Sequence, residues 1–182
     1  SEELTMISGK NVYMGYIHIH NIESGTIVTL LEERKKGGQF LHLADFIERT
    51  KIGIEQVAIL IRVEAFRFTG KNKKVFLWEA HYIHKKLKHV LADDLSLFHE
   101  PIRNFHIPDV ESAAFEDVMD EIELLGFPIG NAFHLVDADL SIFIPSCRFH
   151  EFTGKVISVI GYYITAKPVQ TIKGEQMYFG TF

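Results

Sequence analysis

The chain has 182 residues, of which 47% are apolar and 24% charged, and its net charge at pH 7 is −5. This composition supplies enough apolar surface for one buried core, which excludes wholesale disorder, and the charge excludes a globally basic nucleic-acid binder. No apolar run approaches the roughly 18 residues of a membrane span. The single cysteine, Cys147, excludes an intramolecular disulfide and suits a reducing compartment, so we expect a cytoplasmic protein with no membrane partner.

The two halves of the chain differ in charge. Residues 1–90 contain 14 basic and 10 acidic side chains, a net charge of +4, whereas residues 91–182 contain 5 basic and 14 acidic ones, a net charge of −9. Such asymmetry indicates two surfaces with different partners, although two ordinary solvated segments would give the same numbers.

The first half of the chain reads as a series of helices. A run that begins after Ser24 ends in the basic residues 34–36 and then Gly37-Gly38, which is typical of a helix end. Apolar residues at helical spacing predict further helices over 40–49, 54–66 and 73–90, with a turn at 68–72. Residues 12–19 are apolar and fit either a strand or a turn of helix.

The second half changes character. Residues 91–110 lack periodicity and contain two prolines, which is typical of a linker, and residues 111–125 form an acidic amphipathic helix that ends at Gly126. Residues 137–143 fit a short helix or an irregular connection. Residues 156–168 and 177–182 read as strands, so the predicted fold is mainly α with a small β part (α+β).

The residues that could carry chemistry form no catalytic set. Ten histidines suggest a metal site, with His18 and His20 on one face of a strand and His81 and His84 on one face of a helix. A zinc site needs three or four ligands with closer spacing or carboxylate support, so we expect no metal and no cofactor. No nucleophile, base and orienting group stand together, and we expect no catalytic residue.

Two features remain as candidate binding sites. The first is a basic turn with exposed amides at a helix start, which fits a phosphate or is an ordinary solvated loop. The second is an apolar pentapeptide in the linker, which either packs on its own domain or serves as an anchor for a partner. The basic turn comprises Arg62, Arg67, Lys71, Lys73 and Lys74, and the pentapeptide comprises Asp94, Leu95, Ser96, Leu97 and Phe98.

Several segments, in order, resemble the bacterial replicative DNA polymerase III alpha subunit. Residues 37–49 (GGQFLHLADFIER) are similar to its G-x-F-x-S-L-x-D-F-x-x-R stretch, residues 60–66 (LIRVEAF) to L-I-x-x-G-A-F, and residues 123–127 (ELLGF) to E-x-L-G-F/L. Residues 155–182 look like the first two strands of its oligonucleotide/oligosaccharide-binding (OB) barrel.

The resemblance implies a domain order. Residues 1–90 would be a tandem helix-hairpin-helix DNA-binding region, 91–110 a linker with a clamp-binding peptide, 111–150 an acidic helix with its connection, and 151–182 the start of an incomplete OB-like segment. The family's clamp motif is close to Gln-Leu-Ser/Asp-Leu-Phe, and residues 94–98 match it except at Asp94. The first hairpin reads Asn21-Ile22-Glu23 in place of the family's Gly-Ile/Leu-Gly, so we do not expect it to grip DNA.

The function implied is a non-catalytic part of a DNA-directed DNA polymerase, a nucleotidyltransferase whose catalytic domain would precede this chain. Its partners would be the duplex DNA backbone, the bacterial sliding clamp and the other domains of the parent polymerase. Two alternatives stay open: a protein-interaction module without nucleic-acid binding, and a small metalloenzyme with a histidine site.

Overall fold

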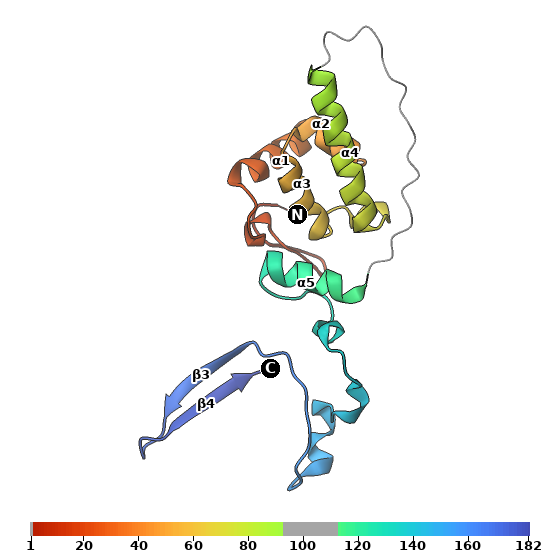
Figure 1. Ribbon diagram of the computed structural model, residues 1–182. Coiled ribbons are helices and arrows are strands. Elements are labelled where there is room, and N and C mark those ends of the chain that lie inside the picture. Colours follow the sequence, from red (N-terminus) through yellow and green to blue (C-terminus); the bar gives the residue numbers. More distant parts are fainter. Residues whose placement is uncertain (1, 93–112) are drawn as a thin grey trace. The chain divides into compact units, whose positions relative to one another are not determined.

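The computed structural model describes residues 2–92 and 113–182 (Figure 1). The chain forms two compact units, Ser1–Gly130 and Asn131–Phe182. The expected α+β class is confirmed, because helices dominate the first unit and small antiparallel strand pairs complete the fold. The four-part division made from the sequence stays a prediction. Among the described residues no helix is both long and apolar enough to cross a membrane.

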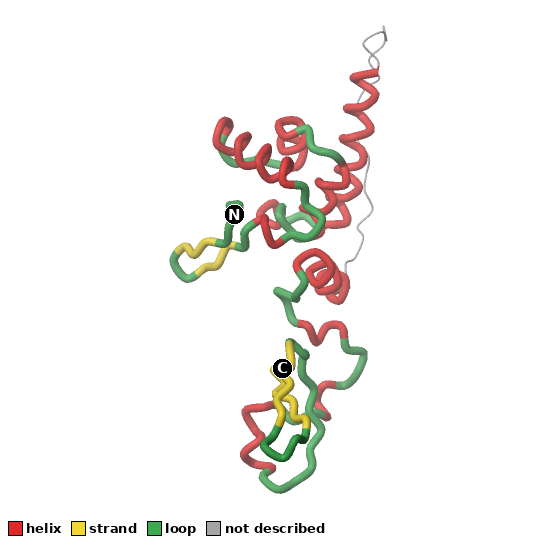
Figure 2. Tube along the Cα trace, turned by 90° about the vertical axis from the view of Figure 1, so that its left-hand side faces the viewer, coloured by secondary structure: helices red, strands yellow, loops and turns green. Residues whose placement is uncertain are grey.

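The first unit begins with a small antiparallel hairpin, β1 and β2, which Figure 2 shows in yellow next to the N-terminus. Short 3₁₀ turns at Tyr16–His18 and Arg67–Thr69 connect the helical elements. The strands and α-helices of this unit are β1 (Met6–Ser8), β2 (Asn11–Tyr13), α1 (Ser24–Gly37), α2 (Leu43–Thr50), α3 (Ile54–Arg62), α4 (Lys73–Ala92) and α5 (Ala114–Leu125).

The core lies where α2 and α3 pack against α4, and Figure 1 shows α4 running alongside them. Phe46 of α2 is 2% exposed and meets the rings of Phe40 and Phe66 edge to face, with centroids 4.9 and 5.1 Å away. Phe76 brings α4 into the same cluster, 5.9 Å from Phe66. Apolar residues from separate helices therefore close one core, as their helical spacing predicts.

Arg49 of α2 holds the end of α1. Its guanidinium donates hydrogen bonds to the backbone oxygens of Glu33 and Gly38, pairs with Asp45 and lies over the Phe40 ring. The last carbonyls of a helix lack intrahelical donors, so a cation in this place satisfies them and complements the helix dipole. Arg49 thereby links the C-terminal end of α1 to α2.

The second unit contains three 3₁₀ segments, at Ala132–Leu135, Leu140–Ile142 and Ser146–Phe152, followed by two strands. Strands β3 (Thr165–Gln170) and β4 (Gln176–Thr181) pair antiparallel, with Thr165 opposite Thr181 and Gln170 opposite Gln176. Gly174, at φ 82°, closes the turn between them, where its N–H donates to the Thr171 oxygen. Every residue of β4 is exposed.

The strand expected over residues 156–168 is observed only in its last part, because β3 covers residues 165–170. Residues 156–164 have strand-forming side chains, but no described segment forms a ladder with them. Their backbone bonds are isolated: the Ile144 N–H donates to the Ser158 oxygen, and the Ile164 N–H donates to the Thr181 oxygen. Strand β3 begins at Thr165, inside the expected run and nine residues after its expected start. Strand propensity describes side chains that fit a pleated surface, and a strand exists only where a partner supplies hydrogen bonds.

Candidate nucleic-acid interface

Three hairpins of the first unit share one backbone pattern. In each, a residue in the left-handed conformation is followed by one further residue, by the N-cap and then by a helix. The left-handed residues have φ angles of 62°, 52° and 71° and precede α1, α3 and α4. The three turns are Asn21-Ile22-Glu23, Lys51-Ile52-Gly53 and Gly70-Lys71-Asn72. The pattern places three helix N-termini, each with unbonded N–H groups, directly behind a tight turn.

The second hairpin has an open backbone at the start of α3. Lys51 ends α2 in the left-handed conformation, and its N–H donates to the Ile47 oxygen. Ile52 is buried and anchors the turn in the core. Gly53 caps α3 with no side chain, and a Cβ placed there would meet no atom within 4 Å. An anion could therefore reach the first amides of α3 beside the exposed Lys51 ammonium.

The first hairpin is held by other parts of the chain. Gln56 of α3 is 8% exposed, accepts a hydrogen bond from the Glu23 N–H and donates to the Asn21 oxygen. The His20 N–H donates to the Leu124 oxygen at the end of α5, 2.7 Å away. This hairpin also has an acidic N-cap at Glu23, which opposes an approaching phosphate.

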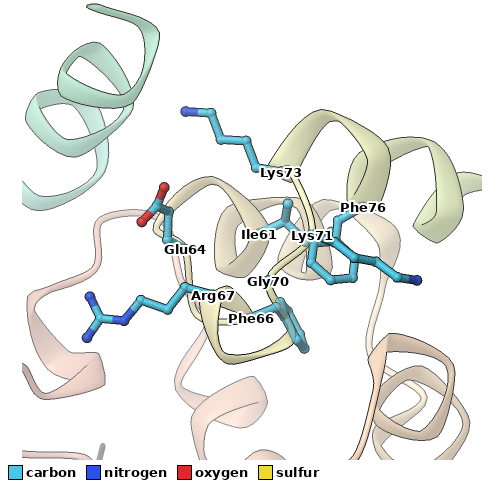
Figure 3. Close-up of a pocket in the computed structure, with 8 residues that line it drawn as sticks. All are labelled: Ile61, Glu64, Phe66, Arg67, Gly70, Lys71, Lys73 and Phe76. Carbon is cyan, nitrogen blue, oxygen red and sulfur yellow. The ribbon is translucent and has the colours of Figure 1, made fainter. Parts of the chain in front are cut away.

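The third hairpin borders a hollow of about 220 Å³, shown in Figure 3. Asn72 caps α4, since its side-chain oxygen accepts from the Lys74 N–H at 2.8 Å. In Figure 3 the side chains of Arg67, Lys71 and Lys73 leave the turn in different directions. The rim is therefore mainly cationic, with the carboxylate of Glu64 as its acidic member.

Helix α5 engages one predicted DNA-binding cation from α3. Arg62 donates from Nε to Asp120 at 2.8 Å, and its terminal nitrogen lies 2.7 Å from Asp120 and 2.5 Å from Glu123. The hydrogen bond to Glu123 raises the pKa of the Arg62 guanidinium above its ordinary value and lowers the pKa of the Glu123 carboxyl below 4.5.

Two cations at the start of α4 also pair with α5. The Lys73 ammonium lies 2.5 Å from Asp117 and 2.6 Å from Asp120, and the Lys74 ammonium lies 2.7 Å from Glu116. The Lys73 side chain is only 9% exposed. Burial acts to lower the pKa of Lys73, but its hydrogen bonds to the two carboxylates outweigh that effect, so the pKa lies above 10.5.

The remaining two predicted cations are more accessible. Arg67 is exposed and makes no ion pair with any residue that the structure describes. Lys71 is about half exposed, pairs with Glu79 at 3.2 Å and lies 5.6 Å from the centre of the Phe76 ring. The five predicted residues are thus neighbours, but their accessibility differs.

The other sequence-based expectations fall elsewhere. The pentapeptide Asp94–Phe98 lies outside the described residues. Within residues 2–92 and 113–182, no three histidine, cysteine, aspartate or glutamate side chains are grouped so as to hold a metal ion. Sequence reasoning missed the second hairpin, although Gly53 directly before an apolar-periodic helix was a usable signal.

Comparison with known proteins agrees with this geometry. Residues 1–76 match the family model described as a helix-hairpin-helix motif. The repeated turns and the family model together define residues 1–76 as a helix-hairpin-helix region.

The chain is 34% identical over 127 residues to the DNA polymerase III subunit alpha of Aquifex aeolicus (strain VF5). The match covers 68% of this chain and 10% of that relative, so the chain spans about a tenth of its relative's length. The resemblance to the bacterial DNA polymerase III alpha subunit is thereby confirmed.

Proposed function

We propose that the first unit binds the sugar–phosphate backbone of duplex DNA without reading its sequence, as part of a cytoplasmic replicative DNA polymerase. The observation that carries the proposal is the second hairpin, where exposed Lys51 stands beside the open helix start at Gly53. Helix amides and a cation bind phosphate oxygens, and such contacts carry no base information. The match of residues 1–76 to the helix-hairpin-helix model supports the same conclusion.

The basic turn adds charge to this contact. Arg67 and Lys71 extend the cationic surface at the third hairpin, and both are exposed. Arg62, Lys73 and Lys74 reach phosphate only by exchanging carboxylates of α5 for phosphate oxygens. We therefore assign the first contact with DNA to Lys51, Arg67 and Lys71.

The test compares two charge-reversal variants by their affinity for a labelled blunt duplex, measured by fluorescence anisotropy. Lys51→Glu should weaken binding about tenfold at 50 mM salt and reduce the salt slope by about 1, since one phosphate contact is lost. Lys35→Glu is the matched control, because Lys35 is an exposed residue near the far end of α1 and undergoes the same change of charge. Equal loss in the two variants would contradict a contact at the hairpin.

We also propose that residues 94–98 bind a bacterial sliding clamp, on the strength of the resemblance. Leu95, Leu97 and Phe98 would supply the apolar anchors. Leu97→Ala combined with Phe98→Ala should weaken binding to the clamp more than tenfold, whereas Ile107→Ala, an apolar truncation outside the pentapeptide, should not. A titration in which the unaltered chain fails to bind the clamp would overturn this part.

A protein-interaction module without nucleic-acid binding is the second candidate. It is favoured by the ion pairs of α5, which engage three of the five predicted cations. The absence of duplex binding at about 20 mM salt, where phosphate contacts are strongest, would select this candidate over the first.

A further inference from the structure

Helix α4 has one buried face and one face that presents aromatic and basic side chains. Phe76 and Ala80 lie in the core at 3% and 0% exposure. Trp78 is 66% exposed. With about 100° of rotation per residue, Tyr82 and Lys85 fall on the same side of the helix as Trp78, within a sector of about 60°.

The charge of this face is positive. Lys85, Lys86 and His81 are exposed on the same side of α4 or at its margin. Glu79 is the single carboxylate in the sequence of α4, lies about 100° from Trp78 around the helix, and is paired with Lys71. Lys86 lies about 80° from Trp78, next to Glu79, whereas the side that holds Trp78, Tyr82 and Lys85 presents no carboxylate of α4 to an anionic ligand.

The exposure of Trp78 indicates a ligand with a flat, unsaturated surface. A tryptophan side chain contributes more apolar area than most residues, and indole rings serve as stacking platforms. Exposed aromatic rings flanked by lysines are the combination that binds single strands, because each unpaired base offers a π-face and each nucleotide a phosphate. In a blunt duplex the bases are already stacked on one another.

We propose that this face of α4 binds single-stranded nucleic acid, with an unpaired base stacked on Trp78 and the neighbouring phosphates against Lys85 and Lys86. The site differs from the hairpins in both place and chemistry. Hairpin contacts use amides at helix starts, whereas Trp78 lies about 7.5 Å along the helix axis from Lys73, the first residue of α4. Charge complementarity and the ring favour a single strand over a protein partner.

Trp78 is the one tryptophan of the chain, so its intrinsic fluorescence reports on this face alone. Titration of the full chain with an oligo(dT) of about 15 nucleotides should quench the fluorescence saturably. In anisotropy with a labelled strand, Trp78→Ala should weaken binding about tenfold, as expected for one stacked base, and Trp78→Phe should weaken it less. Phe115→Ala, which truncates a 51% exposed ring on α5, is the matched control and should leave affinity unchanged.

A second pair of variants tests the phosphate contacts. Lys85→Glu with Lys86→Glu should weaken binding and lower the salt slope by about 1.4, since each single-strand phosphate contributes about 0.7. Trp78→Ala should leave affinity for a blunt duplex unchanged, while Lys51→Glu should reduce duplex binding and spare the single strand. The duplex assay therefore tests the hairpin site, and the single-strand assay tests the α4 face, so a negative result can be assigned to one of the two.

The proposal is overturned if oligo(dT) does not bind, if it binds without changing Trp78 fluorescence, or if Trp78→Ala binds it as tightly as the unaltered chain. Any of these results would leave a protein partner as the ligand for this face. Circular dichroism of each variant confirms that the fold is retained, which is expected because the substituted side chains are exposed.

Discussion

Replacement of Asp120 by asparagine should have opposite effects on stability and on DNA affinity. Asp120 joins α5 to two other helices, because one oxygen accepts from Arg62 at 2.8 Å and the other lies 2.6 Å from the Lys73 ammonium. Its side chain is 16% exposed, so water replaces these bonds poorly. The substituted amide would keep the shape of the side chain and lose its charge.

The cost in stability follows from the bonds that remain. A hydrogen bond to a charged group contributes about 1.5–3 kcal/mol. Arg62 keeps Glu123 and Lys73 keeps Asp117, so the loss corresponds to about one such bond rather than two. We expect Asp120→Asn to lower the free energy of unfolding by about 2 kcal/mol in urea denaturation.

The gain in DNA affinity follows from the same pairs. In the wild-type chain the Asp120 carboxylate competes with DNA phosphate for Arg62 and Lys73, and the substitution removes that competitor. One additional phosphate contact corresponds to an affinity for duplex DNA about tenfold higher at 50 mM salt. Glu121→Gln is the matched control, because it makes the same change of charge on the same helix. The Glu121 carboxylate instead accepts from the backbone N–H groups of Ile129 and Gly130.

Anisotropy with a blunt duplex at about 50 and 150 mM salt decides the outcome. Equal tightening in Asp120→Asn and Glu121→Gln would refute competition at Arg62 and Lys73, because net charge alone would explain it. Weaker binding by Asp120→Asn would refute the reasoning altogether, since it would mean that α5 supports the DNA contact.

Four further changes have defined outcomes. Phe46→Ala should lower the free energy of unfolding by about 3–5 kcal/mol in urea denaturation, because it empties a core site between two aromatic rings. Gln56→Leu should lower it by about 1–3 kcal/mol, because the polar groups that it bonds in the first hairpin lose their partner. Lys51→Gly should raise the free energy of unfolding by about 0.5–1 kcal/mol, because glycine adopts the left-handed conformation without strain. The same change should weaken duplex binding, because a cation is lost. The pKa of Glu123 is lowered in the folded state by its hydrogen bond to Arg62, so its contribution to stability is complete above pH 4.5 and is lost as pH falls through the lowered value. Denaturation curves of the unaltered chain and of Glu123→Gln should therefore differ at neutral pH and converge in acid.

The helices were largely predictable from the sequence. The helix predicted from Ser24 ends at Gly37 as the basic residues and glycines indicate, and α4 begins at Lys73 as expected. These boundaries are local, because capping residues and helical spacing act within one or two turns. The core followed from the same spacing, since the apolar faces of α2 and α3 had to meet another helix.

The second hairpin was harder to recognise because Lys51 stands in a left-handed position that usually favours glycine. Its conformation is stabilised by the buried neighbour Ile52 and by the bond from its own N–H to Ile47. Local sequence rules register only that lysine disfavours the left-handed conformation, whereas the stabilising contacts of Lys51 become visible in the folded structure.

The pairing of α5 with the basic turn could not be predicted from spacing. Arg62 and Asp120 are separated by 58 residues, and Lys73 and Asp120 by 47. The opposite charges of the two halves were visible in the sequence, but we interpreted them as surfaces for different partners. The structure shows instead that part of this charge is matched within the first unit.

The hydrogen bonds that Arg49 donates to the end of α1 make the effects of substitutions at residues 37 and 49 depend on each other. A Cβ at Gly37 would lie 2.6 Å from a terminal nitrogen of Arg49, so alanine there would displace the guanidinium from the carbonyls of Glu33 and Gly38. In a chain that lacks the arginine, this clash would be absent, and the same alanine would improve the helix. The two substitutions are therefore epistatic: the sign of the effect at residue 37 depends on the identity of residue 49.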